Sequence, residues 1–168
     1  MSEKNDFTIT RVFDAPRNLV WKVHTEPEHL AKWWGPKGFK MLACNLDLRP
    51  GGLFHYGMES PDGLKMWGKF VYREIQPQQK LVFVVSFSDE NGGTTRHPMS
   101  SSWPLEVLNT ATFTEKDGKT TMIIKGHPIN AAKDEEAVFF SAFDGMNQGF
   151  NGTYDQFEEY LKSITNSN

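Results

Sequence analysis

Residues 133–163, KDEEAVFFSAFDGMNQGFNGTYDQFEEYLKS, carry the pattern that decides the fold of this chain. Apolar side chains recur through this stretch at spacings of three, four and seven residues, which is the period of an amphipathic α-helix. The recurring residues are Phe139, Phe143, Met146, Phe150, Phe157, Tyr160 and Ile164. The pattern predicts one long helix from about Lys133 to about Ser163, whose aromatic stripe must pack against another element.

The same helix contains Gly145, Gly149 and Gly152 on an arc about 120° from the centre of the aromatic stripe. Each glycine costs about 1 kcal/mol relative to alanine, so the three together cost about 3 kcal/mol. Three explanations are open at this stage. A strand or a second subunit approaches the helix closely, a ligand occupies space beside it, or the helix bends there.

The N-terminal part of the chain predicts a strand followed by two short helices. Residues 7–13 are rich in β-branched and aromatic side chains, which favours a strand. Asp14, two residues before a proline, is a candidate N-cap for the first helix. Thr25 and Glu28 have the spacing of a capping box for the second helix, which should end at the sequence Trp33–Pro36.

The middle of the chain consists of apolar runs separated by Gly, Pro and Asp turns, which is typical of antiparallel strands. We expect strands at residues 39–48, 53–60, 66–75, 81–87, 105–114 and 119–124, with a long loop at 88–104. The fold class is therefore α+β. A curved antiparallel sheet of six to seven strands should wrap around the long C-terminal helix, with the two short helices after the first strand.

Composition limits the classes of protein that the chain can represent. Its 168 residues fit one domain with a core at about 7–161. A content of 38% hydrophobic and 13% aromatic residues excludes intrinsic disorder. No run approaches the ~20 apolar residues of a membrane span, and a net charge of −3 argues against nucleic acid as a partner. The lone Cys44 and the absence of an apolar leader predict a cytoplasmic protein.

Several segments, in this order and at these spacings, resemble the Hsp-90 ATPase activator homologue family. They are Trp33–Pro36, Asp47–Gly52, Trp67–Gly68, Glu74–Pro77, Leu81–Phe83, Gly149–Phe150, Phe157 and Tyr160–Leu161. That family belongs to the START-like (SRPBCC) superfamily, and the resemblance implies a helix-grip fold with a cavity between sheet and helix. It also implies a range of roles: lipid and sterol carriage, hormone reception, polyketide cyclisation or dehydration, and co-chaperone activity.

The motifs of metal, phosphate and covalent chemistry are missing from the sequence. The five histidines show no pair at metal-ligand spacing, and no G-x-S-x-G or P-loop motif occurs. Cys44 lies in a predicted strand, where a buried and inert thiol is the default. We therefore expect no metal and no cofactor.

Strand alternation predicts which side chains face the interior. Met66, Phe70 and Tyr72 share one face, and one of His55 and Tyr56 must join them. The residues that we expect to line a ligand site are Trp34, His55, Tyr56, Met66, Phe70, Tyr72, Phe83, Phe87, Phe143, Met146 and Phe150. The polar members could instead be core groups bonded to the backbone, and Trp34 a structural plug.

These observations predict a protein that binds a small apolar, aromatic or lipid-like molecule rather than an enzyme. One alternative is a cyclase or hydratase, with His55 and Tyr72 as the acid/base pair to check. Another, implied by the resemblance, is a co-chaperone-like activator of an Hsp-90 ATPase. A second copy of the chain is a further partner left open by the helix glycines.

Overall fold

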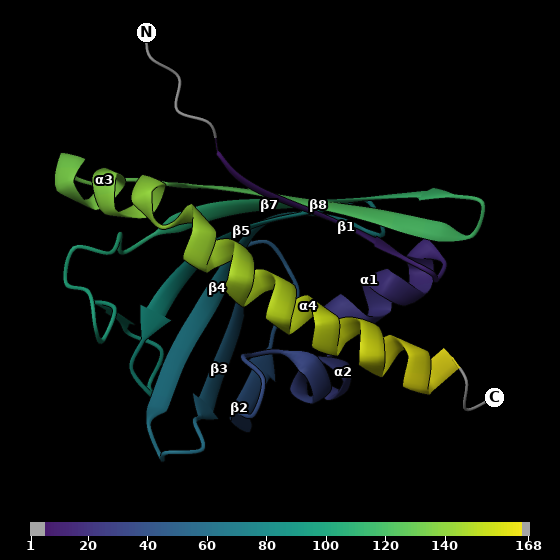
Figure 1. The fold of residues 1–168 in the computed structure, drawn as a ribbon, viewed down its shortest axis with the longest axis horizontal. Coiled ribbons are helices and arrows are strands. Elements are labelled where there is room, and N and C mark those ends of the chain that lie inside the picture. Colours follow the sequence, from purple (N-terminus) through teal and green to yellow (C-terminus); the bar gives the residue numbers. More distant parts are fainter. Residues whose placement is uncertain (1–5, 166–168) are drawn as a thin grey trace, which may run out of the picture.

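The computed structural model describes residues 6–165, which form an antiparallel sheet and four helices (Figure 1). The elements are β1 (Phe7–Phe13), α1 (Arg17–Thr25), α2 (Pro27–Trp33), β2 (Lys40–Leu46), β3 (Leu53–Glu59), β4 (Lys65–Gln76), β5 (Lys80–Ser88), β6 (Thr94–Thr95), β7 (Val107–Lys116), β8 (Lys119–Pro128), α3 (Lys133–Ser141) and α4 (Phe143–Thr165). This order confirms the predicted fold class. No helix within residues 6–165 has the length and hydropathy to cross a membrane.

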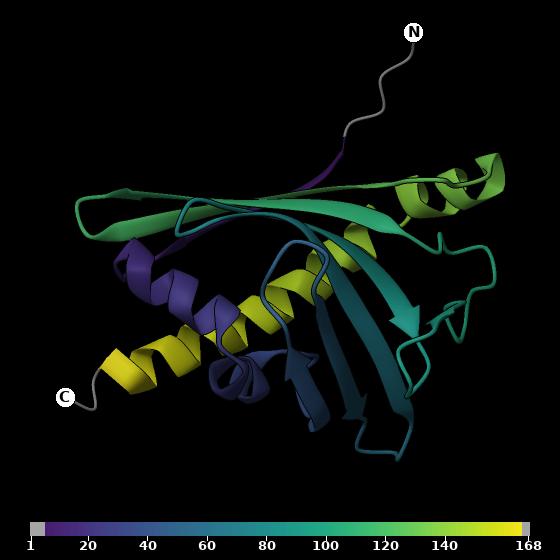
Figure 2. The same ribbon diagram turned by 180° about the vertical axis from the view of Figure 1, so that it is seen from behind.

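The strands follow one another in the order β1-β8-β7-β5-β4-β3-β2, and the short β6 pairs with β5 outside this path. Hairpins connect most neighbours, whereas β1 reaches the far edge and pairs with β8 from Phe7 opposite Gly126 to Phe13 opposite Thr120. Figures 1 and 2 show that the sheet curves and that α4 crosses one face obliquely, from the α3 end to the side of α1 and α2. This is the helix-grip arrangement.

The C-terminal helix is divided, which corrects the prediction of a single helix. α3 ends at Ser141, and Ala142 leaves helical geometry with φ −102° and ψ 10° before α4 begins at Phe143. Phe139 packs on Trp103 of the long loop at a ring-centroid distance of 5.5 Å, whereas α4 turns toward β1 and α2. Because of the break, α3 and α4 pack against different elements. The spacing of apolar residues within the sequence does not show where such a break occurs.

Both predicted N-terminal caps are wrong. The N-cap position of α1 is Pro16 rather than Asp14, and no side chain caps this helix end. α2 begins after Glu26, also without a side-chain cap. Thr25 is the last residue of α1, and its hydroxyl donates to the carbonyl oxygen of Trp21 at 2.8 Å. The capping-box spacing therefore spans the junction of two helices.

The helix glycines do not mark close approach by another element of the described chain. A Cβ added to Gly145, Gly149 or Gly152 would meet no atom within 4 Å. The expectation that a strand packs there is wrong, and the explanations through a second subunit or a ligand stay untested.

One cluster of aromatic residues lies at the end of the interior where α4 meets α1 and α2. Phe157 is fully buried, and its ring centroid lies 4.7 Å from that of Phe13 and 4.8 Å from that of Trp33.

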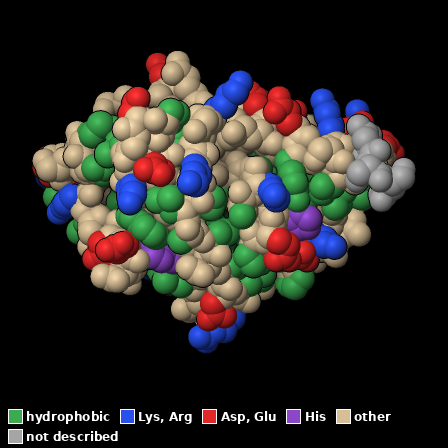
Figure 3. All heavy atoms as spheres, turned by 90° about the horizontal axis from the view of Figure 1, so that it is seen from below, with side chains coloured by type: hydrophobic (Ala, Val, Ile, Leu, Met, Phe, Trp, Pro, Cys, Tyr) green, Lys and Arg blue, Asp and Glu red, His purple; other side chains and the backbone are tan. Residues whose placement is uncertain are grey.

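On the surface seen in Figure 3, acidic and basic side chains are interspersed with small apolar areas. The described residues on this face form no continuous basic field of the kind that binds a phosphate backbone.

Candidate ligand-binding pocket

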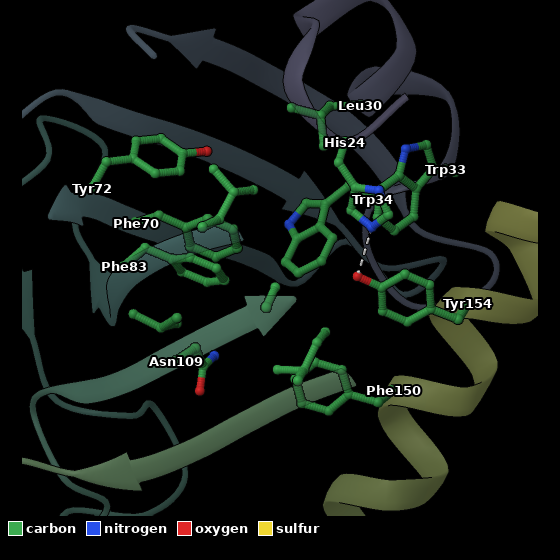
Figure 4. A pocket seen from close by; sticks show the side chains of 14 residues that line it. His24, Leu30, Trp33, Trp34, Phe70, Tyr72, Phe83, Asn109, Phe150 and Tyr154 are labelled. Carbon is green, nitrogen blue, oxygen red and sulfur yellow. Dashed lines mark hydrogen bonds between the residues drawn. The ribbon is translucent and has the colours of Figure 1, made fainter. Parts of the chain in front are cut away.

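A pocket of about 170 Å³ lies between α4 and the middle of the sheet (Figure 4). α4 packs closely on β1 and α2, and its side chains, not its backbone, face strands β4, β5 and β7. The pocket is lined by His24, Leu30, Trp33, Trp34, Phe70, Tyr72, Leu81, Phe83, Val85, Asn109, Ala111, Ile124, Phe150 and Tyr154. Its wall is therefore mainly aromatic and aliphatic.

A second pocket of about 150 Å³ adjoins the first under the long loop and α3. Val85, Asn109 and Phe150 line both spaces. The second pocket is completed by Tyr56, Ser86, Phe87, Trp103, Pro104, Val107, Phe139 and Met146. An apolar cavity of about 150 Å³ holds a benzene molecule, so each space is large enough for one ring.

His24 and Tyr154 form a hydrogen-bonded pair in the wall of the first pocket. His24 Nδ1 lies 2.8 Å from the carbonyl oxygen of Val20, and Nε2 lies 3.1 Å from the hydroxyl oxygen of Tyr154 (Figure 4). Since a carbonyl only accepts, Nδ1 carries the proton, and the neutral ring accepts the Tyr154 hydroxyl proton at Nε2.

Burial controls the protonation of this pair. Desolvation lowers the pKa of His24 to about 4, against the opposing effect of the hydrogen bond to Val20. The pKa of the Tyr154 hydroxyl is raised by the same burial. At neutral pH both side chains are uncharged and tied to one another, so the pair fastens α4 to α1.

Two other polar groups in the pocket walls lack partners. The side chain of Asn109 is 8% exposed and makes no hydrogen bond with any residue in 6–165. Among the same residues, the buried Nε1 of Trp34 has no partner at hydrogen-bond geometry. Burial raises the pKa of the neighbouring Tyr56 hydroxyl, and a polar contact with Trp34 opposes that rise. The apolar wall therefore holds a few unsatisfied polar groups.

Most of the predicted site residues lie at the two pockets. Trp34, Phe70, Tyr72, Phe83 and Phe150 line the first, while Tyr56, Phe87, Met146 and again Phe150 line the second. The inward face predicted for β4 is correct, since Phe70 and Tyr72 are buried. The structure thus brings together the aromatic residues of β3, β4, β5 and α4.

Met66 and Phe143 lie elsewhere. Met66 pairs with Met58 toward the end of the β3–β4 hairpin. The ring of Phe143 stands edge-on to Phe7 at a centroid distance of 5.4 Å, beside β1. Neither side chain lines either of the two pockets.

His55 occupies the face of the sheet opposite Tyr56 and Tyr72. Its ring stacks on Trp67 at 5.3 Å, and Nε2 donates to the carbonyl oxygen of Asp89 at 3.1 Å. The reason is the partner strand: Tyr56 lies opposite Gly68, whose missing side chain leaves room for the phenol ring. His55 and Tyr72 are therefore separated by the sheet, so this pair, named as the one to check for a cyclase or hydratase, does not meet at one site.

The pocket residues that the prediction omitted include His24, Asn109, Trp103 and Tyr154. Tyr154 lies four residues after Phe150 and three before Phe157, so helical spacing could have included it. Asn109 stands between the inward-facing Val107 and Ala111 in β7 and shares their parity. Trp103 lies in the irregular loop, where no repeating pattern predicts the direction in which a side chain points.

No group of three metal-ligating side chains lies within residues 6–165. The Cys44 thiol donates to the carbonyl oxygen of Pro27 at 3.5 Å, and burial raises its pKa. A raised pKa keeps the thiol protonated and unreactive at neutral pH. The chemistry available at the pockets is therefore that of apolar contact and of a few neutral hydrogen-bonding groups.

A curved antiparallel sheet gripping a C-terminal helix, with pockets between the two, defines the START-like, helix-grip class of protein. The sequence profile of the Activator of Hsp90 ATPase homolog 1-like protein family matches residues 14–162, and the chain belongs to this family. The resemblance seen in the sequence is thereby confirmed.

Solved structures agree with this assignment. The chain is similar to protein Ms6760 from Mycobacterium smegmatis, with 28% identity, 96% of each chain covered and a TM-score of 0.74. It is also similar to protein NE0264 from Nitrosomonas europaea, with 25% identity over 98% of this chain and 99% of that one and a TM-score of 0.72. The AHSA1 protein from Silicibacter pomeroyi shares the fold at 17% identity, 95% and 99% coverage, and a TM-score of 0.69. A comparison with curated proteins found no match.

Proposed function

We propose that this protein binds a small, mainly apolar molecule, aromatic or lipid-like, between α4 and the sheet. The observation that carries the proposal is the pair of adjoining pockets walled by large rings inside the fold. Protein interiors normally pack as densely as organic crystals. A closed cavity of 170 Å³ would cost about 4 kcal/mol at about 24 cal/mol per Å³, which is an upper bound for this partly open pocket, and a ligand that fills it recovers part of that stability.

Ligand binding is favoured over the two alternatives. The enzyme hypothesis relied on His55 and Tyr72, which lie on opposite faces of the sheet. His24 and Tyr154 are tied to one another and neutral, which suits a structural contact better than proton transfer. Activation of an Hsp90 ATPase is suggested by the family name alone, whereas the pockets are features of this chain.

A pocket-filling variant tests the proposal. Ala111 lies at 3% exposure in the wall of the first pocket, so Ala111→Phe should fill that space with a ring. Toluene titrated into the isotope-labelled protein should shift the backbone amide signals of β5 and β7 in a saturable way. The Ala111→Phe variant should lose this response. Val12→Phe, at a side chain 56% exposed on β1, is the matched control and should respond as the wild type does.

Native mass spectrometry of protein purified from its own host gives an independent measure. A retained mass of a few hundred daltons, lost on denaturation, would support the proposal and name the ligand. Two results together would overturn it: no saturable response to toluene and no retained molecule. Equal responses from the wild type and Ala111→Phe would show that toluene binds outside the pocket.

A further inference from the structure

We infer that the natural ligand is electrically neutral and carries a hydrogen-bond acceptor, such as a carbonyl oxygen, that binds the side-chain amide of Asn109. This inference rests on the proposed function and specifies the class of ligand for the same site. It comes from one unpartnered polar side chain and from the distribution of charge around both pockets.

Asn109 is placed to contact a ligand in either pocket. It lies in β7 on the inward face, it is more than nine-tenths buried, and it lines both spaces. None of the described residues bonds to the side-chain amide, which is accessible from both pockets. The site therefore contains a polar group whose partner has to come from outside the protein chain.

The packing of the amide indicates which of its atoms is available. Asn109 stands opposite Gly126 of β8, and a Cβ at Gly126 would lie only 2.2 Å from Asn109 Oδ1. The amide oxygen thus rests against the β8 backbone, in space that only a glycine leaves open. Figure 4 shows the amide nitrogen on the side of the pocket. The free group is consequently a donor, and it requires an acceptor on the ligand.

The charge around the pockets decides the second part of the inference. Among the described residues, neither lining includes Lys, Arg, Asp or Glu. His24, the basic side chain in the first lining, is neutral because burial lowers its pKa to about 4. A carboxylate entering this space would lose its hydration and find no cation, which is strongly unfavourable. A neutral acceptor avoids that cost.

Three single-ring compounds of similar size separate the parts of this inference. Acetophenone carries a carbonyl acceptor, α-methylstyrene replaces that carbonyl by a CH₂ group, and benzoate replaces the ketone by a carboxylate. At pH 7.5, acetophenone should bind about tenfold more tightly than α-methylstyrene, the usual effect of one neutral hydrogen bond to a buried group. Benzoate should bind at least about a hundredfold more weakly than acetophenone.

Substitution of the amide identifies the group responsible. Asn109→Leu keeps the approximate volume and removes the donor, so acetophenone should bind about tenfold more weakly while α-methylstyrene is unaffected or improved. Asn45→Leu makes the same change at an exposed position in β2, and it should leave all three affinities as in the wild type. The ligand comparison on the wild type is decisive even where Asn109→Leu folds poorly.

The outcomes distinguish this inference from the proposed function. Equal binding of acetophenone and α-methylstyrene, or benzoate binding as tight as acetophenone, would overturn the inference and leave an apolar binding site. A preference for acetophenone that survives Asn109→Leu would overturn the role of this amide. Failure of all three compounds to bind would overturn the inference, whereas the proposed function is overturned only by the toluene titration and native mass spectrometry together.

Discussion

Lowering the pH should destabilise this protein through one buried histidine. His24 has a pKa of about 4 in the folded chain, compared with 6.5 for an ordinary histidine, because burial disfavours the charged ring. Between these two values the unfolded chain binds more protons than the folded chain. The free energy of unfolding therefore rises with pH in this window, and the stability due to neutral His24 is complete above pH 6.5.

The size of the effect follows from the two pKa values. Each pKa unit corresponds to about 1.4 kcal/mol, so the His24 contribution should fall by about 2 kcal/mol between pH 7.5 and pH 5. The total decrease in this contribution should be about 3 kcal/mol when the pH reaches 4. For a domain with a typical stability of about 5–15 kcal/mol, this is a large share of the total.

Urea unfolding at pH 7.5, 6 and 5 measures this dependence, with His24→Gln as the reference. Glutamine keeps a polar side chain and does not titrate, so the other ionisable groups contribute equally to both proteins. The variant should be less stable than the wild type at pH 7.5, and the difference should shrink by about 2 kcal/mol at pH 5.

Two results would refute the reasoning on His24. The first is a pair of parallel stability curves for the wild type and His24→Gln across this pH range. The second is an NMR titration of the His24 ring nitrogens with a midpoint at 6 or above. The NMR measurement needs no variant, so it remains decisive if His24→Gln fails to fold.

Two further predictions concern α4. Tyr154→Phe removes the hydroxyl that donates to His24 Nε2 and leaves a buried acceptor unpaired, so urea unfolding should show a loss of about 1–3 kcal/mol; unchanged stability would mean that the bond contributes nothing. Gly149→Ala adds a methyl group where no atom lies within 4 Å, and it should stabilise the protein by about 0.5–1 kcal/mol in thermal unfolding. Destabilisation would instead indicate that a second subunit occupies this side of the helix.

Local patterns in the sequence predicted the strands and the direction of their side chains because adjacent strands are joined by short turns. The hairpin of β7 and β8 turns at Lys116–Lys119, where Asp117 and Gly118 both have positive φ. The pairing of β1 with β8 joins segments about a hundred residues apart, and no local pattern encodes it. The family resemblance implied only the helix-grip fold, and the structure shows this pairing.

The direction of a site side chain could be predicted from the sequence only where alternation along its own strand was enough to determine it. Alternation left two choices at His55 and Tyr56, and the choice depends on Gly68 of β4, which leaves room for a ring on one face. The break at Ala142 and the inward position of Trp103 depend on the long loop, which has no repeating pattern. Tertiary contacts, not local propensity, decide these features.

The pockets persist because α4 is held at a distance from the centre of the sheet. At one end, Arg11 of β1 forms ion pairs with Asp155 at 3.0 Å and with Glu158 at 2.9 Å. At the other end, Arg96 of the long loop is paired with Glu135 of α3.

Between these supports, Phe150 and Tyr154 extend from α4 toward the sheet without filling the space (Figure 4). Collapse of α4 onto β4 and β5 would have to break the Arg11 ion pairs and the His24–Tyr154 hydrogen bond together. The rings around Phe157 form a dense core at the α1 and α2 end, and that core holds the helix while its members Trp33 and Tyr154 also form part of the wall of the first pocket.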